Sequence, residues 1–188
     1  VTDGTLKIGV KFDVENAKGN NWTMVDDFRL TYVKPAASAT MTIGSAKYGT
    51  FCAPFDVTLP EGVTAVTATA VTESNINYEV VATEGETLAA NTPVVVKSEN
   101  AVSATFYGKA ATTDFVTKNL LTGVYKDYTC KNGDYILQNQ SGKVGFYLVD
   151  TSKSKPGIKA NRVYLTLPAD ANSIRVFYLE NEDIATGI

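Results

Sequence analysis

The chain has 188 residues, a formal charge of −3 at pH 7 and a pI of about 5.0. This length suits one ordinary domain with at most a fragment of another, and the acidic balance argues against nucleic acid as a partner. The absence of histidine excludes His-dependent triads and His-ligated zinc, and two cysteines are too few for a zinc site with four thiolate ligands. No apolar run reaches the roughly 18 residues of a membrane-spanning helix, so we expect no membrane insertion.

The first 34 residues predict two antiparallel strands. Apolar side chains from Leu6 to Val14 alternate with polar ones, and a second alternation runs through Phe28, Leu30 and Tyr32. This period of two is that of a half-buried strand. Two strands cannot bury a sheet face by themselves. Residues 1–34 are therefore either the first hairpin of a larger sheet or the last strands of a truncated domain, and we expect the second case.

Residues 35–39 indicate a linker, because Pro35 favours extended backbone at Lys34 and the small residues that follow offer little to pack. From Thr40 onward, short segments rich in Val, Thr, Tyr and Phe alternate with turn signals, and no window carries a helical apolar stripe. We therefore predict an all-β fold, with an N-terminal two-stranded hairpin and an antiparallel β-sandwich over residues 40–188. Its strands are expected near residues 40–43, 50–52, 55–59, 63–71, 77–81, 93–97, 102–107, 135–138, 144–149, 162–167 and 173–179.

A short internal similarity links two of these strand entries. The segment Leu88–Asn91 precedes the strand at Val94, and Ile158–Asn161 precedes the strand at Val163. Both have an apolar residue followed by Ala-Asn in a bend. Such a pattern indicates either an internal duplication or the chance recurrence of turn chemistry in a β protein.

Six motifs in the second part of the chain resemble, in order, a β-module of secreted and surface proteins of gut Bacteroidetes: Tyr48–Val57, Leu59–Val63, Ala90–Val96, Gly133–Gln138, Val144–Tyr147 and Ala160–Leu165. The resemblance covers about residues 40–188. It implies a module near the C-terminus of a large multidomain protein, located outside the cell or on its surface, without catalytic residues. We therefore expect a non-catalytic spacer, presentation or adhesion role, with a glycan or a cell-surface protein as partner; the alternative is a carbohydrate-binding module.

The first part of the chain resembles the last two strands of a galactose-binding-like jelly roll, through Gly4–Val10 and Asn21–Leu30. Modules of that class often bind carbohydrate, and an aspartate of the final strand often holds a structural calcium ion. The resemblance implies that most of this domain is missing from residues 1–34, so that its ligand site is incomplete.

Two aspartates in this region are candidate calcium ligands. Asp26 shares the phase of the apolar residues of its strand and so points toward the apolar face, where a carboxylate needs a partner. Ligation of calcium through Asp26 or Asp27 satisfies this need, with further oxygens from the preceding loop. The alternative places Asp26 half-exposed at the strand end, where it caps backbone N–H groups. No other cofactor is expected.

The candidate ligand-binding residues are Trp22, Asn21, Tyr125 and Tyr128. Trp22 follows Asn21 in a polar loop, which suits stacking on a sugar ring, although it equally suits a plug at the end of a sandwich. Tyr107, Tyr125 and Tyr128 flank an irregular stretch, where at least one of them can line a groove, although most tyrosines of a β protein serve sheet packing.

Cys52 and Cys130 are either a disulfide pair or two separate thiols. A bridge would close a long loop and stabilise the fold by about 4 kcal/mol. We favour free thiols, because Cys52 lies in an apolar stretch typical of a small buried residue. Ser152 and Lys155 have the Ser-x-x-Lys spacing of a serine acylase, but Pro156 and Gly157 follow directly and no helix is predicted there, so this segment indicates a solvated loop. We expect no enzymatic activity.

The predicted hairpin of residues 1–34 also suggests a route to self-association. Its large apolar side chains would lack a partner sheet, and an open hairpin edge is a template for a second chain. The short linker limits folding back onto residues 40–188, so we expect a homodimer through residues 1–34.

Overall fold

The computed structural model describes residues 37–72, 75–111, 119–167 and 174–179. The chain separates into two compact units, Val1–Lys34 and Pro35–Ile188, and the description below concerns the second unit. The predicted N-terminal hairpin and the dimer through it lie outside the described residues. So do the candidate site residues Asn21, Trp22, Asp26 and Asp27.

The described residues form strands, turns and loops, without a helix, which confirms the predicted all-β class and antiparallel β-sandwich. The first strand begins earlier than expected. It runs over Ala37–Ile43, so residues 37–39, which we predicted to be linker, belong to the strand. The physical reason is that Ala39 is buried opposite Phe106, where its small side chain fits the packing.

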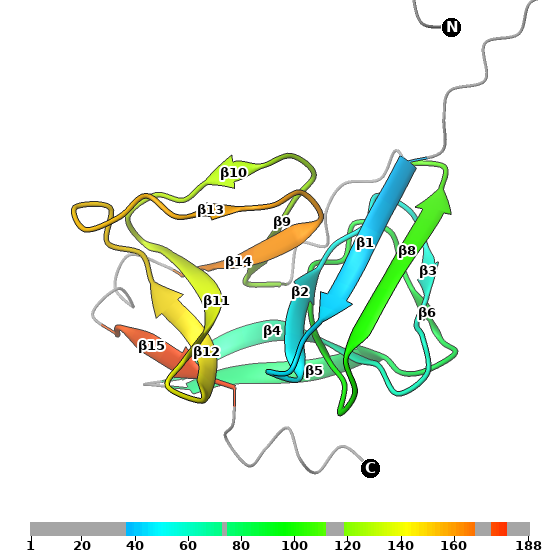
Figure 1. Ribbon diagram of the computed structural model, residues 1–188, viewed down its shortest axis with the longest axis horizontal. Coiled ribbons are helices and arrows are strands. Elements are labelled where there is room, and N and C mark those ends of the chain that lie inside the picture. Colours follow the sequence, from blue (N-terminus) through cyan, green and yellow to red (C-terminus); the bar gives the residue numbers. More distant parts are fainter. Residues whose placement is uncertain (1–36, 73–74, 112–118, 168–173, 180–188) are drawn as a thin grey trace, which may run out of the picture. The chain divides into compact units, whose positions relative to one another are not determined.

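Two large antiparallel sheets form the sandwich (Figure 1). The four-stranded sheet has the order β2 (Tyr48–Phe51), β7 (Val94–Lys97), β4 (Thr64–Thr72) and β5 (Asn75–Ala82). The five-stranded sheet has the order β15 (Val176–Tyr178), β12 (Lys143–Leu148), β11 (Asp134–Gln140), β14 (Arg162–Thr166) and β9 (Leu121–Val124).

Three two-stranded ribbons complete the unit. They pair β1 (Ala37–Ile43) with β8 (Val102–Gly108), β3 (Val57–Thr58) with β6 (Thr87–Leu88), and β10 (Tyr128–Thr129) with β13 (Gly157–Ile158). In Figure 1 the β1–β8 and β10–β13 ribbons lie on different parts of the unit. The two shorter ribbons were not predicted as pairs, because two residues are too few to show alternation.

A central core lies between the two large sheets. It contains Cys52, Val66, Ala68, Ile76, Val95, Leu121, Tyr135, Val144, Phe146, Val163, Leu165, Leu167, Phe177 and Leu179. The alternation of strand side chains places every second residue of a central strand in this core. Thus Val95 of β7 and Leu165 of β14 face it, and their strand neighbours face the other way.

Each large sheet has a second core on its outer side. The first outer core joins the four-stranded sheet to the β1–β8 and β3–β6 ribbons and contains Ala39, Met41, Ile43, Phe51, Ala53, Phe55, Val57, Leu59, Val63, Ala65, Ala82, Leu88, Val94 and Val96. The second outer core joins the five-stranded sheet to the β10–β13 ribbon. It is smaller and contains Cys130, Ile136 and Val149, with Tyr128, Ile158 and Tyr164 packed against them.

Residues 48–97 and 121–166, named here the first and second repeats, have the same strand pairing. In the first repeat β2 pairs with β7, β3 with β6, and β4 with both β5 and β7. In the second repeat β9 pairs with β14, β10 with β13, and β11 with both β12 and β14. The short sequence similarity therefore marks a structural duplication within the unit.

The equivalent Ala-Asn bends have the same backbone geometry. Asn91 and Asn161 adopt left-handed conformations, with φ of 59° and 61°. The Asn91 N–H donates to the Ala53 carbonyl at 2.8 Å, and the Asn161 N–H donates to the Val124 carbonyl at 2.7 Å. Asparagine tolerates this conformation better than most residues, which explains its presence at both bends.

An aspartate stabilises each bend at equivalent positions. The Ala90 N–H donates to Asp56 Oδ1 at 2.8 Å, and the Ala160 N–H donates to Asp127 Oδ1 at 3.2 Å. Both aspartates directly precede the first strand of their short ribbon. The duplication thus extends from strand pairing to individual side-chain hydrogen bonds.

The repeats differ in what covers them. Among the described residues, the β1–β8 ribbon has no counterpart over the second repeat, where β15 instead pairs with β12. Phe51 and Val96 of the first repeat are buried beneath their cover. The strand registers place Thr122 and Thr166 at the equivalent positions, and their hydroxyl oxygens lie 3.3 Å apart in an exposed pair. The side chains at these positions are therefore polar where the cover is missing.

Replacement of Asn161 tests the backbone geometry of the bend. We expect Asn161→Ala to destabilise the unit by about 1 kcal/mol more than Asn161→Gly, because both lose the side-chain hydrogen bond and only alanine is strained in the left-handed region. Urea unfolding midpoints at constant m-value measure this difference. Equal stability of the two variants would contradict the backbone explanation.

Candidate functional site

Tyr125, a predicted ligand-binding residue, lies at the junction between the two repeats. It directly follows β9 and is half-buried against the central core. Its hydroxyl oxygen lies 2.5 Å from Asn91 Oδ1, 3.3 Å from the Ala53 carbonyl and 3.4 Å from Cys52 Sγ. These three partners belong to the first repeat, so the tyrosine connects one repeat to the other.

A reciprocal backbone and side-chain pair lies at the same junction. The Cys52 N–H donates to the Asn161 carbonyl at 3.2 Å, and Asn161 Nδ2 donates to the Cys52 carbonyl, also at 3.2 Å. The left-handed bend at Asn161 presents both of these groups to β2. Asn161 of the second repeat thereby satisfies the backbone N–H and carbonyl of Cys52, which directly follows β2 in the first repeat.

Arg162 continues this junction along β14. Its guanidinium donates to the Thr50 carbonyl at 3.0 Å, and the Val163 N–H donates to Thr50 Oγ1 at 3.3 Å. Burial lowers the pKa of Arg162 from its ordinary value. Sequence reasoning did not identify Thr50 or Arg162, because each has its partner far away in the chain. The only available signal was the Ala-Asn bend that directly precedes Arg162.

Both cysteines are free, buried thiols in different cores. Burial raises the pKa of the Cys52 thiol to about 11, and the hydrogen bond with Tyr125 opposes this rise only partly. Burial, followed by the charge of Asp134, raises the pKa of Cys130. Because the thiolate is the reactive form, neither group is activated for nucleophilic attack near neutral pH.

Tyr128, the other predicted aromatic, belongs to the second outer core. Its ring stacks on Tyr164 with centroids 4.8 Å apart and planes at 7°. Its hydroxyl donates to Asp134 Oδ2 at 3.0 Å, and the same oxygen accepts the Lys131 N–H at 2.7 Å. Burial raises the pKa of Tyr128, and its hydrogen bonds with Tyr164 and Asp134 raise it further. The ring fixes the β10–β13 ribbon to its sheet and contacts a different core from Tyr125.

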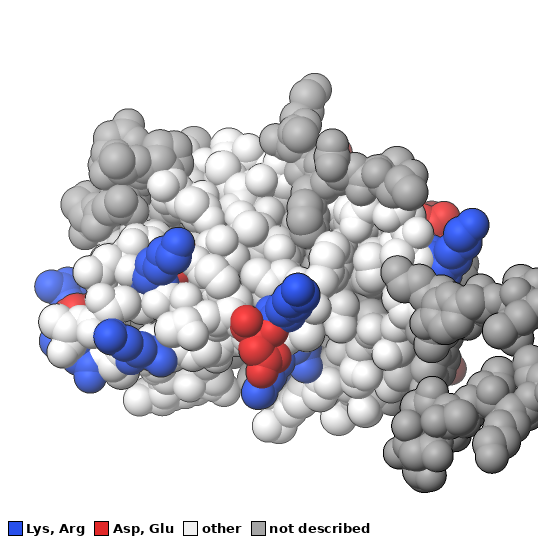
Figure 2. All heavy atoms as spheres, turned by 90° about the horizontal axis from the view of Figure 1, so that it is seen from above, with Lys and Arg blue, Asp and Glu red and all other residues white. Residues whose placement is uncertain are grey.

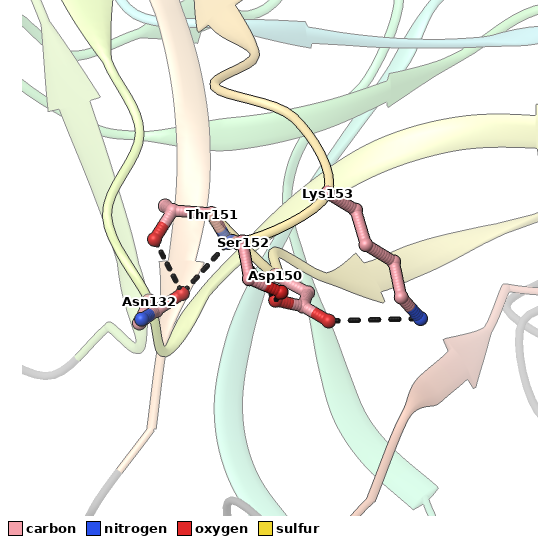
Figure 3. Close-up of polar contacts among 5 residues, drawn as sticks. All are labelled: Asn132, Asp150, Thr151, Ser152 and Lys153. Carbon is pink, nitrogen blue, oxygen red and sulfur yellow. Dashed lines mark hydrogen bonds and ion pairs between the residues drawn. The ribbon is translucent and has the colours of Figure 1, made fainter.

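The loop with the Ser-x-x-Lys spacing is held by its own polar residues (Figure 3). Ser152 donates through its hydroxyl to Asp150 Oδ1 at 2.6 Å, and Lys153 Nζ lies 3.6 Å from Asp150 Oδ2. Asn132 Oδ1 accepts the N–H and the hydroxyl of Thr151, both at 2.8 Å. Residues 151–153 form a turn rather than a helix, so Ser152 has the geometry of a loop residue and not of an acylase nucleophile.

Charged side chains are sparse on the face seen from the side of β10 and β13 (Figure 2), and both signs occur there. Among the described residues, no group of three or more His, Cys, Asp or Glu is placed to hold a metal ion. The same residues include no helix that is long and apolar enough to cross a membrane. Comparisons with protein-family models, with curated proteins and with solved structures found no match to this chain.

Removal of the Tyr125 hydroxyl tests the junction. We expect Tyr125→Phe to lower the free energy of unfolding by about 1–2 kcal/mol, because a part-buried acceptor group loses its donor. Tyr107→Phe is the matched control, since its side chain is 73% exposed, and we expect a change within about 0.5 kcal/mol. Chemical denaturation measures both variants. If Tyr125→Phe lowers the free energy of unfolding no more than Tyr107→Phe does, the hydrogen bonds of the Tyr125 hydroxyl do not stabilise the unit.

The raised pKa of Cys52 predicts a specific pH dependence. The ordinary value is 9.0 and the value in the folded unit is about 11, so the folded state retains a proton that the unfolded chain loses in this interval. Stability is therefore complete below pH 9 and falls as the pH rises toward 11, with a slope of up to about 1.4 kcal/mol per pH unit from this group. We expect Cys52→Ala to flatten the slope between pH 9 and 11 in urea titrations. An unchanged slope would contradict the assignment.

Proposed function

We propose that residues 35–188 are a non-catalytic β-module that spaces or presents neighbouring parts of a larger extracellular or cell-surface protein. The observation that carries the proposal is the junction between the repeats. Tyr125, Asn161 and Arg162 all bond across it, and the central core is continuous beneath it. A unit joined in this way behaves as one body and keeps a fixed distance between its ends.

The local chemistry of the reactive groups supports a non-catalytic role. Burial keeps the Cys52 thiol protonated near neutral pH, and the Ser152 hydroxyl donates to a carboxylate of its own turn. The Asp134 carboxylate accepts hydrogen bonds from Tyr128 and from the Lys131 N–H. Each of these side chains therefore has a structural partner that accounts for its position.

Replacement of the whole module tests the spacer role. In the protein that contains it, deletion of residues 35–188 should impair the function of the neighbouring parts. An unrelated β-sandwich of similar length should restore that function, because a spacer acts through its size and rigidity. If the unrelated sandwich fails where the natural module succeeds, the side chains of this module have a specific role and the spacer proposal is wrong.

Two further measurements address location and catalysis. Antibodies against residues 35–188 should label intact cells, and protease added outside should remove the signal. Purified protein should give no turnover on a panel of glycoside and ester substrates. Turnover that disappears on a single substitution, for example Ser152→Ala, would contradict the non-catalytic part of the proposal.

A further inference from the structure

The outward face of the β1–β8 ribbon carries hydroxyl groups only. Both strands alternate strictly, so that every second side chain points away from the first outer core. The outward residues are all exposed, and they are Ser38, Thr40, Thr42, Ser103, Thr105 and Tyr107. The name hydroxyl face is used below for these residues.

The hydroxyl face is a regular grid. Antiparallel pairing sets Ser38 opposite Tyr107, Thr40 opposite Thr105 and Thr42 opposite Ser103. Facing side chains of such a ribbon are about 5 Å apart, and successive rows are about 6.8 Å apart. The hydroxyl oxygens of Thr40 and Thr105 lie 2.9 Å apart, within hydrogen-bond distance. The result is a two-column array of hydrogen-bond donors and acceptors on the outward side of the ribbon.

The array rests on rigid support. Ala39, Met41 and Ile43, which alternate with its residues on β1, are at most 1% exposed in the first outer core. Phe106 of β8 packs edge-on against Phe51, with ring centroids 5.9 Å apart. A ligand on this face would therefore bind to groups that are already in place, which reduces the entropy lost on binding.

The chemistry of the face selects a neutral, hydroxyl-rich ligand. The hydroxyl face contains no Asp, Glu, Lys or Arg, whereas other strands carry exposed charged residues, such as Glu79 on β5 and Lys143 on β12. Each hydroxyl both donates and accepts hydrogen bonds, as the hydroxyls of a sugar do. Tyr107 is 73% exposed at one end of the grid, so that its ring is available for contact with the C–H face of a sugar ring.

We propose that the hydroxyl face binds a neutral polysaccharide chain. Tyr107 stacks on one sugar ring, and the serine and threonine hydroxyls bond to the sugars that lie along the ribbon. This activity goes beyond a spacer role, which needs no particular surface. It also differs from a site at Tyr125 or Tyr128, because both of those rings have structural partners within the second unit.

Affinity electrophoresis of the full chain tests the proposal. The gels contain soluble neutral polysaccharides (a β-glucan, a xylan, a galactomannan and an α-glucan) or the acidic polygalacturonate. We expect at least one neutral polysaccharide to retard the protein and polygalacturonate to leave it unaffected. Tyr107→Ala should weaken retention by about tenfold, as expected for the loss of one aromatic contact. The matched control is Tyr178→Ala, since Tyr178 is 41% exposed on β15, outside the hydroxyl face, and retention should remain.

A second pair of variants tests the hydroxyls without changing the shape of the ribbon. Thr40→Val with Thr105→Val removes two facing hydroxyls and keeps the β-branched side chains, so retention should fall while the thermal midpoint stays similar. Thr58→Val with Thr129→Val, at exposed positions of the other ribbons, should leave retention unchanged. The proposal is overturned if no neutral polysaccharide retards the chain, if polygalacturonate retards it equally, or if control and test variants lose retention alike. These variants preserve the size of the module, so their outcome is independent of the spacer test.

Discussion

The central core is the interaction on which the rest of the unit depends. Neither large sheet could bury its inner face alone, and side chains of both sheets share one core between them, to which β7 contributes Val95 and β14 contributes Leu165. The junction hydrogen bonds of Tyr125, Asn161 and Arg162 lie at the edge of this contact and fix its register. The stability of the unit and the support of the outer ribbons follow from this shared burial, and the proposed spacer role relies on it.

The two repeats have the same strand pairing, but their outer sheet surfaces differ in polarity. The two repeats share strand pairing, left-handed asparagine bends and aspartate contacts, but among the described residues the β1–β8 ribbon covers the first repeat and has no counterpart over the second. Under that ribbon the sheet is aliphatic and aromatic, while the uncovered positions carry Thr122 and Thr166. The outward side of the β1–β8 ribbon presents hydroxyl groups to solvent. Each layer thus ends where its outward side chains become polar.

Local patterns predict much of this fold, and contacts between distant residues determine the rest. Segments rich in Val, Thr, Tyr and Phe between turn signals predicted strands at 40–43 and 102–107, within β1 and β8, and the lack of a helical stripe predicted the all-β class. The strands β6, β9, β10 and β13 were missed, because two to four residues carry no clear period. The predicted aromatics Tyr125 and Tyr128 gain their roles from partners on other strands, which no spacing reveals. Trp22, Asn21, Asp26 and Asp27 lie outside the described residues and stay predictions.

Native-state hydrogen exchange tests most directly whether one core unites the two repeats. Leu165→Ala removes a fully buried side chain of the second repeat and should destabilise the unit by about 3 kcal/mol. If the central core is shared, the opening free energy of the β7 amides in the first repeat should fall by the same amount as that of the β14 amides. A loss of protection confined to the second repeat, with β7 unchanged, would show that the repeats are stable independently and would contradict this account.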